Sequence, residues 1–164
     1  MEEFIKLLND YILPLNLKSI GVAVLCSLII GSERQIFGKP AGIRTSILIC
    51  VGTYCFVSLS TSLMGATTDA SRVVGQIVTG IGFFGAGLMF NNGEIVQGVT
   101  SASVIWMLAA VGSLVGFEFH GAAFLITTLT VLVLLGVDFL ERLGTRLKSG
   151  VHKDRNGDDE NLNK

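Results

Sequence analysis

The chain has 164 residues, of which half are hydrophobic and only 15% are charged, and its formal net charge is −1. Soluble domains carry roughly 25% charged residues, so this composition excludes an ordinary water-soluble domain with a charged surface. A net charge this close to zero gives no indication of nucleic-acid binding, and we expect no nucleic-acid partner.

The first apolar stretch, residues 12–32, is interrupted near its start by Pro14, Asn16 and Lys18. Its charge-free part is shorter than the ~20 residues that cross the hydrocarbon core as a helix. Lys18 can snorkel to the interface and lengthen the span. We therefore predict a transmembrane helix over residues 12–32, with a re-entrant or interfacial helix as the alternative. Residues 1–11 are predicted as an N-terminal segment without a signal peptide.

A charged segment separates the first apolar stretch from the second. Glu33 and Arg34 end the first predicted span, and Arg44 and Thr45 begin the second. The two arginines are interpreted either as ordinary cytoplasmic anchors or as functional groups. A carboxylate contributes little to orientation and is costly to desolvate. We therefore predict that Glu33 pairs with Arg44 and closes the inner mouth of the bundle.

Residues 45–137 carry only Asp69, Arg72, Glu94 and Glu118 as charged groups. These groups divide the region into apolar runs that are each close to the length of a transmembrane helix. The connections are short, so neighbouring helices are expected to be antiparallel. The predicted spans are residues 12–32, 45–66, 71–91, 95–116 and 120–140.

The predicted fold is therefore an all-α membrane protein, a compact bundle of about five transmembrane helices within residues 12–147. Residues 148–164 are predicted as a polar disordered tail. Positive residues mark the cytoplasmic side of a membrane. They gather between the first two spans and after the last one, which predicts an outside N-terminus and a cytoplasmic C-terminus.

The third predicted span is rich in glycine and other small residues. In lipid, small residues let helices approach closely. The pattern is interpreted as central packing within the bundle, as a dimer seam, or as a helix break that exposes carbonyl groups. We expect a homodimer through this span. The residues concerned are Gly75, Thr79, Gly80, Gly82, Gly85, Ala86 and Gly87.

Asp69, Arg72 and Gln76 lie on one face at the start of the same span. One interpretation is an N-terminal cap with an interfacial Asp69–Arg72 ion pair. The other is a polar lining that reaches into the bundle, which Gln76 favours because a buried amide must be paired.

The fourth predicted span carries hydroxyl residues near its start and Trp106 close to its centre. The hydroxyl groups of Thr100, Ser101 and Ser103 are expected to bond back along their own helix. A tryptophan at mid-membrane is expected to pack within the bundle or against another subunit. His120 is interpreted as an ordinary solvated histidine or as a sensor of external pH.

Three sequence blocks resemble the MgtC/SapB family of membrane proteins. Gly-Ser-Glu-Arg-Gln at 31–35 with Lys-Pro-Ala-Gly-Ile-Arg-Thr at 39–45 resembles that family's Gly-x-Glu-Arg-Glu and Lys-x-Ala-Gly-Leu-Arg-Thr signature. Residues 69–87 look like its second block, and Thr-Ser-Ala-Ser-Val-Ile-Trp at 100–106 looks like its third. The chain departs from the pattern at Gln35, and we expect a short-form member without the C-terminal cytoplasmic region of the longer members.

The resemblance implies a bacterial inner-membrane protein linked to magnesium homeostasis and to adaptation to acid or low magnesium. It implies a regulator of a partner membrane complex such as ATP synthase or a magnesium transporter. The alternative is a small transporter or channel for magnesium, protons or an anion. No catalytic, cofactor or metal motif is recognised, so we expect no enzyme activity. The functional positions carried over are Glu33, Arg34, Arg44, Thr45, Asp69, Arg72 and Gln76.

Overall fold

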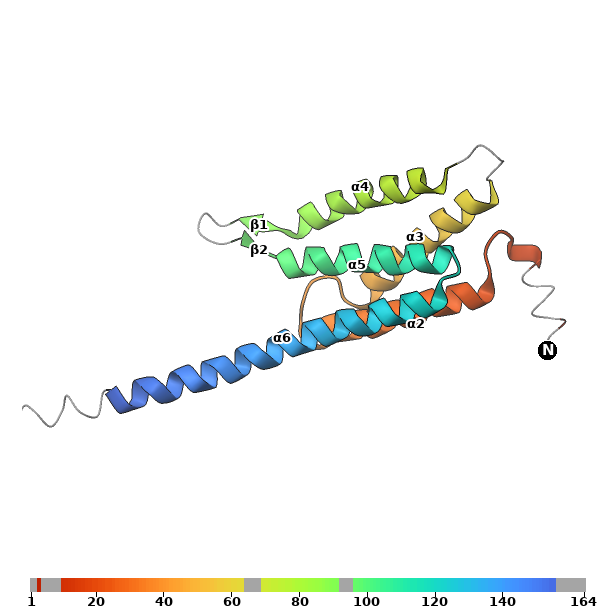
Figure 1. The fold of residues 1–164 in the computed structure, drawn as a ribbon. Coiled ribbons are helices and arrows are strands. Elements are labelled where there is room, and N and C mark those ends of the chain that lie inside the picture. Colours follow the sequence, from red (N-terminus) through yellow and green to blue (C-terminus); the bar gives the residue numbers. More distant parts are fainter. Residues whose placement is uncertain (1–2, 4–9, 64–68, 92–95, 156–164) are drawn as a thin grey trace, which may run out of the picture. The chain divides into compact units, whose positions relative to one another are not determined.

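The computed structural model describes residues 3, 10–63, 69–91 and 96–155 (Figure 1). Within these residues the chain is helical apart from one two-residue antiparallel ladder, which confirms the predicted all-α fold. The elements are α2 (Leu17–Ile36), α3 (Ile43–Ser62), α4 (Ala70–Leu88), β1 (Phe90–Asn91), β2 (Val96–Gln97), α5 (Val99–Gly116) and α6 (His120–Arg155).

The chain divides into two compact units, Met1–Thr130 and Val131–Lys164. The first unit contains α2, α3, α4, α5 and the first turns of α6, and it holds all the candidate site residues. The second unit contains the remainder of α6.

Four helices in the described part of the chain are long and apolar enough to cross a membrane: α2, α3, α5 and residues His120–Val137 of α6. The third predicted span is a helix, α4, but it is not among these four. Arg72, Gln76 and the glycines lower its hydropathy.

The core of the first unit lies where α2, α3 and α5 meet the start of α6. Its fully buried members come from all four helices and are Ala23, Cys26, Cys50, Tyr54, Val111, Val115 and Ala123. Cys26 and Cys50 are unpaired thiols buried among these residues, as expected for small apolar packing residues.

Close helix contacts occur at glycines outside the predicted third span. A Cβ atom at Gly112 of α5 would overlap the carbonyl oxygen of Cys50 on α3, and one at Gly116 would meet the side chain of Val57. A Cβ at Gly31 of α2 would lie 2.8 Å from the Cα of Ile43. These glycines therefore let α2, α3 and α5 approach backbone to backbone.

The start of α2 explains how an apolar stretch that contains Pro14 and Asn16 still forms a helix. The Asn16 side chain caps α2 by accepting a hydrogen bond from the Lys18 backbone N–H at 2.8 Å. Two residues of α3 hold this entry in place. The Asn16 backbone N–H donates to the Tyr54 hydroxyl at 2.7 Å, and Ser58 donates to the Pro14 carbonyl at 2.7 Å.

The last helix is longer than predicted. α6 continues to Arg155, so residues 148–155 are helical, and the prediction of a disordered tail is wrong for them. Residues 156–164 lie outside the described residues, as do most of residues 1–11.

Candidate functional site

The last turn of α2 places two charged residues inside the bundle. Glu33 is 6% exposed and Arg34 is 3% exposed. The Nη1 atom of Arg34 lies 3.6 Å from Oε2 of Glu33, and its Nη2 donates a hydrogen bond to the Ser101 hydroxyl of α5 at 3.0 Å. The guanidinium therefore joins the end of α2 to the start of α5.

The polar atoms of this buried Glu33–Arg34 cluster are only partly hydrogen-bonded. Oε2 of Glu33 and Nε of Arg34 are both inaccessible and have no hydrogen-bond partner among the described residues. Removing one member of a buried pair leaves an uncompensated charge in a low-dielectric interior. The two residues therefore depend strongly on each other.

The predicted partner of Glu33 was wrong. The carboxylate lies beside Arg34, the next residue in the chain, while Arg44 and Thr45 are exposed at the start of α3. The prediction that Ser101 bonds only within its own helix was also wrong, because its hydroxyl oxygen accepts a hydrogen bond from Arg34 of α2. Ser103 does bond back along its helix, to the carbonyl of Val99 at 3.0 Å. Local spacing carries no signal for a contact between residues 67 positions apart.

The second group of candidate residues lies at the start of α4. Asp69 caps this helix, because its carboxylate accepts a hydrogen bond from the Ser71 backbone N–H at 2.9 Å. This bond, together with a bond to the Ser71 side chain, lowers the pKa of Asp69 below its ordinary value. The predicted cap is confirmed. The predicted Asp69–Arg72 ion pair is not formed, since the described residues contain one ion pair, Glu33–Arg34.

Most glycines of α4 are exposed, and Gly85 is the buried one among those that the structure describes. A Cβ atom at Gly75, Gly80, Gly82 or Gly87 would meet nothing within 4 Å, and one at Gly85 would make an ordinary 3.5 Å contact with Ala102. Central packing within the chain is therefore contradicted for Gly75, Gly80, Gly82 and Gly87, while Gly85 packs against α5.

Two other small residues of α4 and the tryptophan of α5 are also exposed. Thr79 and Ala86 are exposed, and the Thr79 hydroxyl bonds to the Gly75 carbonyl of its own helix at 2.9 Å. Trp106 is 51% exposed, so the bundle of this chain leaves half of its surface uncovered.

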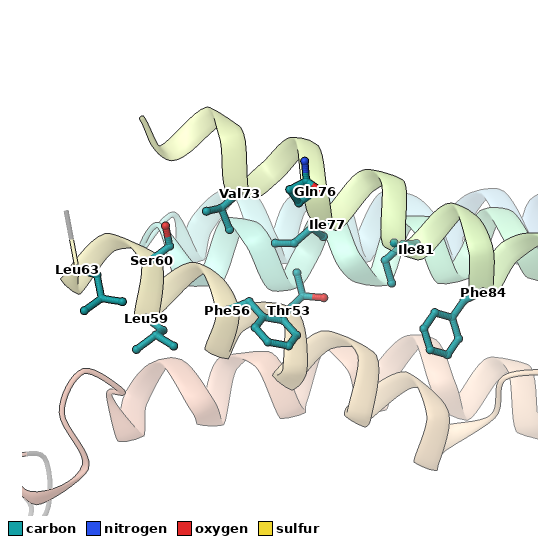
Figure 2. Close-up of a pocket in the computed structure, with 11 residues that line it drawn as sticks. Thr53, Phe56, Leu59, Ser60, Leu63, Val73, Gln76, Ile77, Ile81 and Phe84 are labelled. Atoms are coloured by element: carbon teal, nitrogen blue, oxygen red, sulfur yellow. The ribbon is translucent and has the colours of Figure 1, made fainter. Parts of the chain in front are cut away.

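A groove separates α4 from α3 (Figure 2). Its volume is about 660 Å³, and its lining is largely apolar. Figure 2 shows Val73, Ile77 and Ile81 of α4 directed towards α3, while the amide end of Gln76 points away from it. The full lining is Thr53, Phe56, Leu59, Ser60, Leu63, Val73, Gln76, Ile77, Gly80, Ile81 and Phe84.

The candidate polar residues fall into two separate groups. Glu33 and Arg34 lie at the end where α2 leads into α3, whereas Asp69, Arg72 and Gln76 lie at the end where α3 leads into α4 (Figure 1). The fold therefore does not bring them together into one polar route.

One polar contact near the N-terminal end of α2 was not predicted from the sequence. Nε2 of His120, the first residue of α6, lies 3.0 Å from the hydroxyl of Ser19. Ser19 is buried, and His120 is half-buried. His120 is therefore hydrogen-bonded between two helices and is not simply a solvated loop residue.

The family model and the similar proteins both indicate the same family. The model of the MgtC family matches residues 20–143. Protein MgtC of Brucella abortus (strain 2308) is 47% identical over 88 residues, which cover 54% of this chain and 37% of that protein.

Two further relatives match over longer stretches. The protein named "Putative magnesium transporter YhiD" of Escherichia coli (strain K12) is 37% identical over 125 residues, 72% of this chain and 58% of that protein. Protein SapB of Bacillus subtilis (strain 168) is 33% identical over 144 residues, 82% of this chain and 60% of that protein. The chain thus spans less than two thirds of the length of each of these three relatives. No solved structure matches the chain.

Proposed function

The chain belongs to the MgtC family, and from that premise we propose that it is a non-enzymatic protein of the bacterial inner membrane that regulates a partner membrane complex. In this proposal it acts as a homodimer, through contacts made within the bilayer. A role in magnesium homeostasis and in acid or low-magnesium stress is part of the proposal, and the name of the YhiD relative supports the link to magnesium.

The observation that carries the proposal is the uncovered face of α4. Small residues make strong helix contacts in membranes because they let two backbones approach. In α4 four such glycines have open space around them, whereas Gly31 of α2 and Gly112 and Gly116 of α5 lie in close contact with α3. A helix with this composition and no close neighbour on that face is suited to receive a helix of another protein.

The polar end of α4 supports the same proposal. Gln76 is exposed, and its amide end points away from α3. An amide within a bilayer needs hydrogen-bond partners, and interhelical hydrogen bonds contribute to helix association there. A partner helix that supplies a donor and an acceptor opposite Gln76 would satisfy this amide.

A second candidate function is the transport of magnesium, protons or an anion, which the printed name of the YhiD relative favours. It is the weaker proposal because Glu33 and Arg34 lie at the opposite end of the bundle from Asp69, Arg72 and Gln76. The groove between α3 and α4 is also largely apolar, whereas magnesium requires oxygen ligands and loses its water reluctantly.

Reconstitution and crosslinking separate the two functions. We expect purified protein in liposomes to give no flux of magnesium, protons or chloride above that of empty vesicles. Flux that disappears in Asp69→Asn would overturn the regulatory proposal in favour of transport.

The regulatory proposal is tested in cells by a photo-crosslinking residue placed at Gly80 or Gly82. We expect a specific crosslink to another membrane protein, which mass spectrometry would identify. The same residue at Leu48, an exposed position of α3, is the matched control. If Gly80 and Leu48 give the same pattern of crosslinks, the α4 face has no specific partner and the proposal fails.

A further inference from the structure

The groove between α3 and α4 has a polar end and an apolar end. Leu63 and Val73 line it where α3 ends and α4 begins, and Phe84 lines it about three helical turns further along α4 (Figure 2). Asp69 and Arg72 come just before Val73 at the first end and are exposed. Because α3 is long and apolar enough to cross the membrane, this end of the groove lies at the membrane surface and the other end lies within the hydrocarbon.

The charged groups at the polar end are available to a ligand. Asp69 and Arg72 form no ion pair with each other, since the ion pair among the described residues is Glu33–Arg34. Arg72 and Gln76 are four residues apart and share one face of α4, and Gln76 lines the groove with its amide end directed away from α3. From the membrane surface inwards, α4 therefore presents a carboxylate, a guanidinium, an amide and then aliphatic side chains.

A phospholipid in a bilayer presents complementary groups in the same order. Its phosphate is the anion that a guanidinium binds with paired hydrogen bonds, its ester carbonyls accept hydrogen bonds, and its acyl chains run on into the hydrocarbon. An ethanolamine headgroup adds an ammonium group, which complements the Asp69 carboxylate. A headgroup that carries only negative charge offers nothing to that carboxylate.

We propose that the groove between α3 and α4 binds one phospholipid with an ethanolamine headgroup. The phosphate binds Arg72, the ammonium group lies at Asp69, and an acyl chain runs along Ile77 and Ile81. The volume of about 660 Å³ lies within the ~300–1,000 Å³ of small-molecule sites. Gly80 lines the groove and has open space around it, which leaves room for the chain.

The site does not rest on the regulatory function proposed above, because the two use different sides of α4. Gly75 and Gly82 are each two residues from a groove-lining residue, Val73 or Phe84, which places them about 160° away around the helix. Helix association in lipid relies on small residues and hydrogen bonds. The groove is lined mainly by bulky apolar side chains, which acyl chains contact equally well.

Lipid binding by the purified full chain tests the headgroup contacts. The chain is delipidated in detergent and titrated with phosphatidylethanolamine, and bound lipid is counted by native mass spectrometry. We expect one tightly bound lipid per chain, and Arg72→Gln should weaken its binding about tenfold, as expected for a lost hydrogen bond between charged groups. Arg72→Lys should recover part of the loss. Arg44→Gln, at an exposed arginine of α3, is the matched control and should bind like the unchanged chain.

Two substitutions on opposite sides of α4 test the acyl-chain contact. Gly80→Leu fills the groove, whereas Gly82→Leu adds the same side chain where nothing lies within 4 Å on the other side. With a phosphatidylethanolamine that carries a photoreactive acyl chain, we expect labelling of residues 53–63 and 73–84. Labelling should fall several-fold in Gly80→Leu and stay unchanged in Gly82→Leu. Size-exclusion chromatography checks that both variants are folded.

Four results would overturn the site. They are equal binding by Arg72→Gln and Arg44→Gln, equal binding of phosphatidylglycerol with the same acyl chains, equal labelling of the two glycine variants, and labelling around Leu48 as strong as in the groove, which shows contact with bulk lipid only. Photo-crosslinks from Gly80 to protein but never to lipid would place a partner helix in the groove. That result would overturn the lipid site while the regulatory proposal stands.

Discussion

Helices α4 and α5 are both rich in small residues, yet they use them in opposite ways. In α5, Gly112 and Gly116 lie against the backbone and side chains of α3, where no Cβ atom fits. In α4, Gly75, Gly80 and Gly82 have open space around them. Glycine content thus marks a helix that can make close contacts, and the neighbouring helices decide whether it makes them within its own chain.

The charged residues also differ between the two regions, being buried at the end of α2 and exposed at the start of α4. The Glu33–Arg34 pair at the end of α2 is buried and tied to α5 through Ser101. Asp69 and Arg72 at the start of α4 are exposed and form no ion pair with each other. The α2, α3 and α5 assembly thus holds the buried polar and close glycine contacts, whereas most polar and small residues of α4 are exposed. The four predictions below test that division.

The largest effect is expected from Arg34→Ala. It leaves Glu33 buried without a partner, which should cost about 3–5 kcal/mol of stability. Thermal unfolding in detergent, followed by size-exclusion chromatography, measures the change. Arg44→Ala, at an exposed position of the same polar segment, should change stability by less than about 0.5 kcal/mol. Equal losses in the two variants would contradict the buried pair.

The next effect is expected from Gly112→Ala. The added methyl group would overlap the Cys50 carbonyl and approach the Thr53 side chain, so α3 and α5 must separate, at a cost of about 1–3 kcal/mol. Gly80→Ala on α4 is the matched control. It should be neutral or stabilising by up to about 1 kcal/mol, because alanine favours helix and nothing lies in its way. If both variants lose stability together, the two helices do not differ as described.

A smaller effect is expected from Ser101→Ala, which removes one hydrogen bond to the Arg34 guanidinium. Bonds to charged groups contribute about 1.5–3 kcal/mol, and we expect a loss near the lower end because the Glu33 carboxylate remains. Ser103→Ala, whose hydroxyl bonds only within its own helix, should be close to neutral. A double-mutant cycle of Ser101→Ala with Arg34→Ala should show coupling. Additive losses would rule out the contact.

The smallest effect concerns pH. The capping bonds lower the pKa of Asp69, so its contribution is present above the unfolded pKa of about 3.9 and is lost as pH falls through the folded pKa. Acidification below about pH 4 should therefore loosen the start of α4. Asp69→Asn keeps an oxygen that accepts the capping bond and should remove this pH dependence, which hydrogen exchange at the first turn of α4 measures. An unchanged pH profile in the variant would exclude Asp69 as its source.

The class of fold and the approximate helices could be predicted from the order of the residues alone. Long apolar runs broken by isolated charges can be stable only as helices in lipid, because backbone groups there must bond within the helix. The same local reasoning identified Asp69 as a cap, since capping involves residues two positions apart. It also identified Glu33 and Arg34 as unusual, since charges within apolar sequence are costly.

Which residues contact one another could be seen only in the folded chain. It paired Glu33 with Arg34 instead of Arg44, it brought Ser101 to the guanidinium, and it assigned close packing to Gly112 and Gly116 instead of the glycines of α4. These contacts depend on the rotation of each helix about its axis and on which helices are neighbours. In a chain whose surfaces are nearly all apolar, sequence periodicity does not reveal the inward face, because lipid and protein interior solvate the same side chains equally well.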